Sequence, residues 1–117
     1  MKHVILLVDH DLSILVPMAF LLREQGYGVI TARHDDEALE VLQNGDVVDT
    51  LITDVQMPVL DGFDLARHAK VLRPAIIILY CTDHPEMCKE LGTALGPVLS
   101  KPYSLERVHQ EIERLRA

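Results

Sequence analysis

The chain is poor in several residue types, and each shortage excludes a class of protein. Its 117 residues contain no Trp, two Cys and no apolar run long enough to span a membrane. Cys81 and Cys88 are separated by six residues, which matches no common zinc site, and His84 between them adds too few ligands. We therefore expect reduced thiols and a cytoplasmic protein.

Basic residues are also scarce. Eleven Lys and Arg stand against 18 acidic residues, the formal charge is -7, and no basic cluster stands out. Nucleic-acid binding depends on Lys and Arg that neutralise phosphates, so we expect no direct nucleic-acid partner, and the lack of a spanning segment predicts no membrane partner. The residues Met1 to His3 lead directly into an apolar strand, which predicts no signal peptide.

The apolar residues that are present form a regular pattern. The length suits one domain, residues 1–117, and the pattern predicts five strands that alternate with five helices. The predicted strands are 4–8, 28–32, 47–53, 75–79 and 97–100; the predicted helices are 12–25, 35–43, 61–72, 87–91 and one that Ser104 begins. Strict alternation indicates a doubly wound α/β fold with a five-stranded parallel sheet. From the number and size of the elements we choose the flavodoxin-like strand order 2-1-3-4-5.

The segment from residue 51 to residue 62 presents one carboxylate on a short loop. Asp54 comes where the third predicted strand ends, and Pro58 cannot extend that strand because it lacks an N–H. Asp61-Gly62 is a turn signal, and Asp61 is suited to cap the following helix. Ligands of open α/β sheets bind at this end of the strands, so Asp54 is a candidate site residue.

Two further charged residues are expected to converge on Asp54. Asp9 ends the first predicted strand, which neighbours the third in this order, and Lys101 ends the fifth. Two close carboxylates repel each other unless a cation lies between them, and Mg²⁺ prefers oxygen ligands and often a phosphate. A nearby lysine would neutralise a phosphoryl oxygen. The group therefore suits phosphoryl transfer onto a carboxylate, giving an aspartyl phosphate.

These segments together resemble the CheY-like receiver domain of bacterial two-component response regulators. The resemblance rests on Val8-Asp9, on Asp54-x-x-Met57-Pro58-x-x-Asp61-Gly62 and on Lys101-Pro102-Tyr103, and it covers the chain from Lys2 to Ala117. It implies that Asp54 is the phosphoacceptor, that Asp9, Asp54 and the backbone carbonyl of Gln56 hold Mg²⁺, and that Lys101 contacts the phosphoryl group. The implied phosphoryl donor is a sensor histidine kinase or a histidine phosphotransfer protein.

Three positions depart from the family pattern. His10 stands where a second acid is usual, and Asp11, one residue later, is better placed as a helix cap. His10 either serves as a further metal ligand or turns outward; in the first case we expect weaker Mg²⁺ binding, with Mn²⁺ able to substitute. The expected switch region comprises Tyr80, Thr82, Val98 and Tyr103. Its usual hydroxyl residue falls near the bulky Tyr80, its usual aromatic residue is Val98, and Tyr103 fits the aromatic position after Lys-Pro.

The resemblance predicts a signalling domain in a two-component phosphorelay rather than an enzyme. Such a domain assists only its own phosphorylation and dephosphorylation, and it acts by altering its interaction with a downstream output protein. The alternative is a pseudo-receiver, an interaction module of the same fold that does not use phosphate. A flavodoxin is disfavoured because Asp9 and Asp11 would repel a flavin phosphate. A haloacid-dehalogenase-type phosphatase is disfavoured because Gln56 stands where that family has a second Asp.

Overall fold

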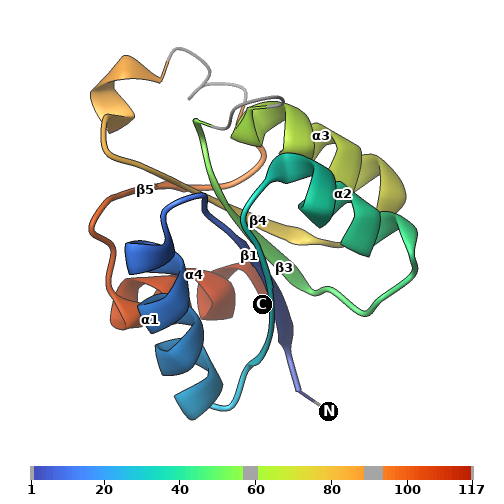
Figure 1. The fold of residues 1–117 in the computed structure, drawn as a ribbon, viewed down its shortest axis with the longest axis horizontal. Coiled ribbons are helices and arrows are strands. Elements are labelled where there is room, and N and C mark those ends of the chain that lie inside the picture. Colours follow the sequence, from blue (N-terminus) through green and yellow to red (C-terminus); the bar gives the residue numbers. More distant parts are fainter. Residues whose placement is uncertain (1, 57–60, 89–93, 117) are drawn as a thin grey trace.

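Five strands form one parallel sheet through the centre of the molecule (Figure 1). They are β1 (Val4–Val8), β2 (Gly28–Ala32), β3 (Thr50–Asp54), β4 (Ile77–Thr82) and β5 (Val98–Ser100). Their order is β2-β1-β3-β4-β5, which confirms the predicted flavodoxin-like topology. The computed structural model describes residues 2–56, 61–88 and 94–116.

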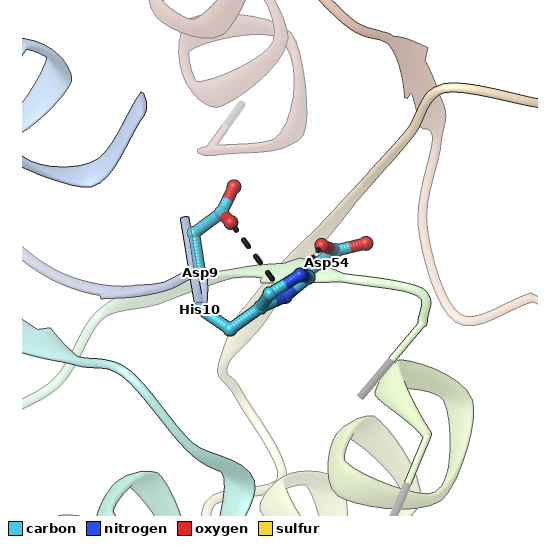
Figure 2. Close-up of side chains that lie close together, drawn as sticks. All are labelled: Asp9, His10 and Asp54. Carbon is cyan, nitrogen blue, oxygen red and sulfur yellow. Dashed lines mark ion pairs between the residues drawn. The ribbon is translucent and has the colours of Figure 1, made fainter. Parts of the chain in front are cut away.

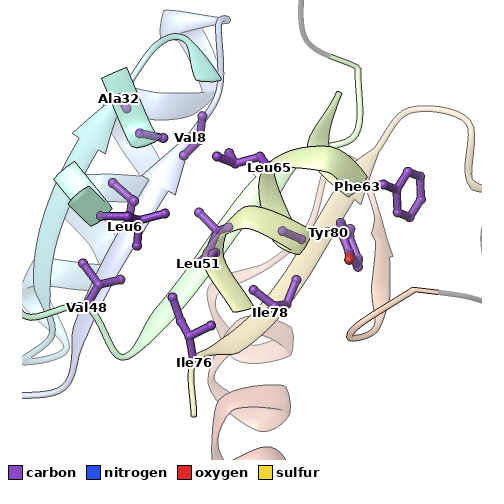
Figure 3. Packing of buried hydrophobic residues seen from close by; sticks show 14 of the residues in the cluster. Leu6, Val8, Ala32, Val48, Leu51, Phe63, Leu65, Ile76, Ile78 and Tyr80 are labelled. Atoms are coloured by element: carbon purple, nitrogen blue, oxygen red, sulfur yellow. The ribbon is translucent and has the colours of Figure 1, made fainter. Parts of the chain in front are cut away.

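Helices cover both faces of the sheet. One face packs against α2 (Asp35–Gln43) and α3 (Gly62–Leu72), and the other against α1 (Leu12–Glu24) and α4 (Leu105–Arg116) (Figure 1). Each face carries its own apolar core, because successive strand residues point to opposite sides. On the α2–α3 side, Leu6, Leu51 and Ile78 are among the buried residues (Figure 3).

The predicted number of five helices is wrong for the described part of the chain, which contains four α-helices and one short 3-10 helix, η1 (Pro85–Met87). The predicted helix 87–91 begins where η1 ends and continues into residues 89–93, which lie outside the described residues. Cys88 already has extended dihedral angles, φ -82° and ψ 99°, so the turn ends there.

The helix ends follow local chemistry that the sequence shows. Asp11 caps α1 by accepting a hydrogen bond from the Ser13 N–H, and Asp61 caps α3 by accepting one from the Asp64 N–H. Both interactions satisfy an otherwise unpaired N–H of the first helical turn. The predicted capping role of Asp11 is therefore confirmed, as is that of Asp61.

Strand β4 is longer at its carboxyl end than the predicted strand 75–79. It continues through Tyr80, Cys81 and Thr82, and Cys81 lies opposite Asp54 in the register of β3 and β4. Asp54 is itself the last residue of β3 rather than the first residue after it. Regular backbone pairing therefore reaches Asp54 itself on the β4 side, and on the β1 side it ends at the preceding residue, Thr53.

Candidate phosphoryl and metal site

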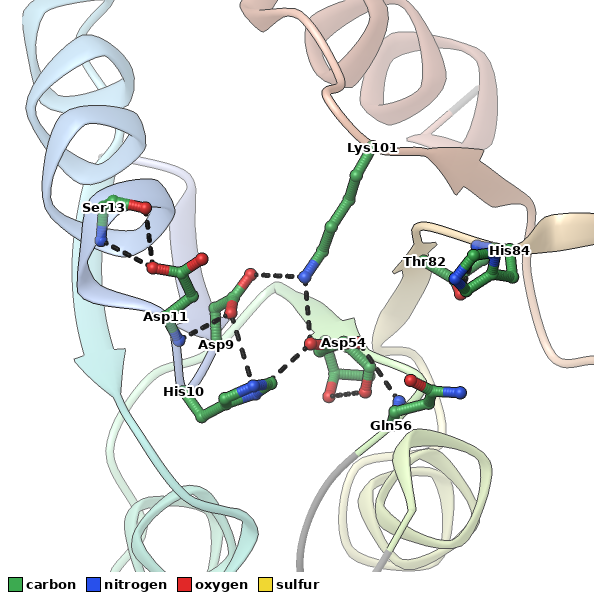
Figure 4. A network of polar contacts seen from close by, with 10 residues as sticks. Asp9, His10, Asp11, Ser13, Asp54, Gln56, Thr82, His84 and Lys101 are labelled. Carbon is green, nitrogen blue, oxygen red and sulfur yellow. Dashed lines mark hydrogen bonds and ion pairs between the residues drawn. The ribbon is translucent and has the colours of Figure 1, made fainter.

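Three charged residues from separate strands meet at the carboxyl edge of the sheet (Figure 4). Asp9 follows β1, Asp54 ends β3 and Lys101 follows β5. Strands β1 and β3 are hydrogen-bonded neighbours, and Val8 lies opposite Thr53. The parallel arrangement therefore places the two aspartates side by side, as the predicted strand order requires.

The ammonium group of Lys101 bridges the two carboxylates. Its Nζ lies 2.9 Å from Asp9 Oδ2 and 2.9 Å from Asp54 Oδ2. The side chains are buried, with 4% exposure for Lys101, 0% for Asp9 and 6% for Asp54. Burial tends to lower the pKa of Lys101, but the hydrogen bond to Asp54 and the ion pair with Asp9 outweigh it, and its pKa lies above its usual range. Lys101 is therefore charged across the whole neutral range.

His10 points toward the same two aspartates. Its Nδ1 lies 3.5 Å from Asp54 Oδ2 and 4.0 Å from Asp9 Oδ1 (Figure 2). The imidazole is 51% exposed, so it forms the solvent-facing side of the site while the aspartates form the buried side. The ring faces the site and does not turn outward.

Asp11 lies next to the site but is engaged elsewhere. Its Oδ1 accepts hydrogen bonds from Ser13 N at 2.9 Å and from Ser13 Oγ at 2.6 Å. These bonds hold the pKa of the Asp11 carboxyl below its usual range. The Asp11 backbone N–H in turn donates to Asp9 Oδ1 at 2.9 Å, which fixes the orientation of that carboxylate.

The backbone after β3 is held close to Asp54. The Gln56 N–H donates to Asp54 Oδ1 at 3.1 Å, and the Gly62 N–H donates to the Val55 carbonyl at 2.8 Å. A Cβ added at Gly62 would overlap the Asp54 carbonyl oxygen, so α3 starts in direct contact with this backbone. The predicted Asp61-Gly62 turn thus has a second purpose, since glycine permits the close approach.

The four expected switch residues do not form one cluster. Tyr80 is 1% exposed, packs beside Phe63 on the α2–α3 side and accepts a hydrogen bond from the Leu95 N–H. Val98 lies opposite Tyr80 on β5 and packs against the same core. Tyr103 belongs to the core on the other face, where burial raises its pKa.

Thr82 is the hydroxyl residue nearest the carboxyl edge of β4. It is 2% exposed, its Oγ1 accepts a hydrogen bond from the His84 N–H, and its carbonyl accepts one from the Lys101 N–H at 2.8 Å. Thr82 therefore connects β4 to the backbone of the site lysine. Tyr80, two residues earlier, is a core residue in this structure.

Cys81 borders the site, although the sequence pattern drew attention to it only as a possible zinc ligand. It is fully buried opposite Asp54, and burial raises the pKa of its thiol far above the ordinary value of 9.0. The sequence signal that could have located Cys81 is the alternation of side chains between the two faces of β4, followed to the end of the strand at Thr82. A protonated thiol adds no charge next to Asp54.

The donor set suits a divalent cation. Asp9, His10 and Asp54 each offer one ligand atom, and these three atoms lie within 4.8 Å of one another (Figure 2). Two carboxylates supply the hard oxygen ligands that Mg²⁺ prefers, and the imidazole supplies a nitrogen. The residues present therefore fit a bound dication beside Asp54.

The sequence matches a known family along nearly its whole length. The model of the response regulator receiver domain matches residues 5–113. The chain is 33% identical over 120 residues to the alkaline phosphatase synthesis transcriptional regulatory protein PhoP of Bacillus subtilis, covering 98% of this chain and 49% of PhoP. It is 30% identical over 112 residues to the transcriptional regulatory protein GlrR of Escherichia coli, covering 93% of this chain and 25% of GlrR. The chain thus spans a quarter to about half the length of these curated relatives.

Solved structures of receiver proteins share the fold. The chemotaxis protein CheY4 of Vibrio cholerae is 31% identical, with a TM-score of 0.85, over 98% of this chain and 99% of CheY4. The response regulator TrrA of Thermotoga maritima, solved in complex with Mg²⁺ and BeF, is 25% identical, with a TM-score of 0.85, over 98% of this chain and 99% of TrrA.

The parallel sheet and the acidic edge define a CheY-like signalling domain, and the family match is specific. The chain belongs to the response regulator receiver domain family of two-component phosphorelay signalling. Receiver domains are generally non-enzymatic signalling modules, and they typically bind Mg²⁺ at acidic residues. In the part of the chain that the structure describes, no helix combines the length and apolar character needed to cross a membrane.

Proposed function

We propose that this domain, residues 1–117, accepts a phosphoryl group on the carboxylate of Asp54. The observation that carries the proposal is the shared ammonium of Lys101, 2.9 Å from Asp54 and from Asp9 at the carboxyl edge of the sheet. A carboxylate is a competent phosphoryl acceptor when positive charge nearby neutralises the transferred oxygens. Asp54 is the last residue of β3, at the carboxyl edge of the sheet where ligands of such folds bind.

The surrounding residues take separate roles in this proposal. Asp9, Asp54 and the backbone carbonyl of Gln56 would hold Mg²⁺, which when bound would supply positive charge to the phosphoryl oxygens. Lys101 moves from its bridging position to contact the phosphoryl group, and the Gln56 N–H keeps one oxygen of Asp54 oriented. The domain in this way assists its own phosphorylation and dephosphorylation, without being an enzyme for another substrate.

The proposed phosphoryl donor is a sensor histidine kinase or a histidine phosphotransfer protein. The readout is an altered interaction with a downstream output protein or output domain. Three strands contribute to the site, so a change at Asp54 alters the position of Lys101 and, through the Lys101 N–H bond to Thr82, the β4–β5 edge. Thr82, Val98 and the neighbouring η1 turn are the proposed switch region, and Tyr80 and Tyr103 are its buried supports.

Phosphorylation with acetyl phosphate and Mg²⁺, read by intact mass, tests the proposal. The wild type is expected to gain one phosphoryl group, and Asp54→Asn none, because an amide is not a nucleophile here. Asp46→Asn, an exposed acid in the loop after α2, is the matched control and is expected to label as the wild type does. Equal labelling of Asp54→Asn and wild type would show that another residue is the acceptor.

A pseudo-receiver is the second candidate, and His10 is the observation that favours it. An imidazole 3.5 Å from Asp54 occupies the position of a family acid and reduces the negative charge available to a cation. This candidate predicts a folded wild-type protein that gains no phosphate from acetyl phosphate at saturating Mg²⁺ or Mn²⁺, and that binds its partner equally well with and without acetyl phosphate.

A further inference from the structure

We propose that His10 is a metal ligand, and that it makes this site selective for a first-row transition dication such as Mn²⁺ or Co²⁺ over Mg²⁺. The inference deepens the proposed function, on whose site it rests, because it assigns the chemical class of the cation. It concerns a residue by which this chain departs from the acidic pattern of its family.

The position of the imidazole is the first support. His10 Nδ1 lies between the two carboxylates, at 3.5 Å from Asp54 Oδ2 and 4.0 Å from Asp9 Oδ1 (Figure 2). Ligand atoms bound at right angles to one ion at about 2.1 Å lie about 3 Å apart. The two Nδ1 separations exceed this by 1 Å or less, and the three candidate ligand atoms lie within 4.8 Å of one another. The imidazole is 51% exposed, so it can rotate toward an ion without repacking the core.

The charge of the site is the second support. Asp9 and Asp54 contribute two negative charges, and Lys101 offsets one of them at 2.9 Å. Asp11 does not replace the missing acid, because its carboxylate is occupied by two hydrogen bonds from Ser13. Mg²⁺ binds mainly through charge and loses water reluctantly, so a site with one net negative charge holds it weakly.

The ligand chemistry is the third support. An imidazole nitrogen adds no negative charge, but it donates an electron pair to the metal. First-row transition dications gain more from such a donor than Mg²⁺ does, with affinity rising from Mn²⁺ to Co²⁺. His10 thus shifts the preference of the site toward these ions while the two carboxylates keep it able to accompany a phosphoryl group.

Metal binding to the unphosphorylated full chain tests the inference directly. Mn²⁺ binding is followed by electron paramagnetic resonance, and Mg²⁺ and Co²⁺ by competition against Mn²⁺. The Mn²⁺-over-Mg²⁺ affinity ratio is expected to be about tenfold larger in wild type than in His10→Asp, which restores a third carboxylate. The electron spin-echo spectrum of bound Mn²⁺ is expected to show modulation from a directly bound nitrogen.

The controls separate a ligand from a bystander. His10→Ala should lose the nitrogen modulation, whereas His84→Ala should keep it, because the His84 side chain pairs with Glu86 outside the site. Absence of nitrogen modulation in wild type, or equal affinity ratios in wild type and His10→Asp, would overturn the inference. Either result would mean that His10 only pairs with Asp54.

The outcome is distinguishable from that of the proposed function. Nitrogen-bound Mn²⁺ in a wild-type protein that takes no phosphate would sink the phosphoacceptor proposal and leave this inference standing. Phosphorylation of Asp54 in a protein whose bound Mn²⁺ has no nitrogen ligand would support the phosphoacceptor proposal and overturn this inference.

Discussion

Replacement of Lys101 by Met is expected to destabilise the fold severely. From the sequence alone, loss of Lys101 is expected to leave folding nearly intact, because a charge at the end of a strand contributes little to stability. The structure leads us to expect a larger loss, because the side chain is 4% exposed and bridges two buried carboxylates. Met keeps the apolar stem and removes only the ammonium, so Asp9 and Asp54 are left facing each other without a cation.

The magnitude follows from the geometry. At 2.9 Å and an effective dielectric constant of about 20, each contact with the ammonium is worth about 6 kcal/mol before desolvation is subtracted. Removing one partner of a buried ion pair typically costs about 3–5 kcal/mol, because the remaining charge stays buried and unpaired. A domain of this size has a total stability of about 5–15 kcal/mol, so the loss is a large fraction of it.

Urea unfolding followed by circular dichroism measures the effect. Lys2→Met, which removes an exposed lysine, is the matched control and is expected to lie within about 0.5 kcal/mol of wild type. The double variant Lys101→Met with Asp9→Asn should recover part of the loss, since one of the two repelling charges is gone. The reasoning fails if Lys101→Met unfolds within about 0.5 kcal/mol of wild type, or if Asp9→Asn makes it less stable still.

Three further perturbations test the surroundings of the site. Burial raises the pKa of the Cys81 thiol, so above pH 9.0 the thiol ionises in the unfolded protein but stays protonated in the folded one. The unfolding free energy measured in urea titrations should therefore fall by up to about 1.4 kcal/mol per pH unit. Cys81→Ala should lack this contribution to the pH dependence. Gly62→Ala should destabilise the protein by about 1–3 kcal/mol in the same assay, because its Cβ would overlap the Asp54 carbonyl oxygen; a neutral effect would show that α3 can shift freely. Tyr80→Phe should cost about 1 kcal/mol through loss of the hydrogen bond from Leu95, and an unchanged midpoint would contradict that bond.

The topology could be predicted from the sequence because its signals are local. Buried strands appear as apolar runs, and the caps at Asp11 and Asp61 are recognisable within three residues of the helix start. Strict alternation of strands and helices then leaves few sheet arrangements, and the edge that carries Asp9 and Asp54 follows from any of them.

The remaining features depend on contacts that are distant in the sequence. Strand β4 extends to Thr82 because β3 and β5 pair with it on both sides, and a polar Thr at the end of an apolar run carries no such signal. The burial of Lys101 arises only when β1, β3 and β5 are assembled around it. The direction of His10 likewise depends on the chain that surrounds it, so the sequence leaves two orientations of its ring open.

The two outer strands of the sheet differ in length, which restricts how another chain can associate with each. Strand β2 has five residues along its outer edge, from Gly28 to Ala32, where the Val29 carbonyl accepts a hydrogen bond from the Arg23 side chain, whereas β5 has three residues, from Val98 to Ser100. A short edge gives an incoming strand too few backbone hydrogen bonds to extend the sheet. A protein that approaches the β5 side must therefore recognise side chains and helix surfaces, and strand addition is favoured only at β2.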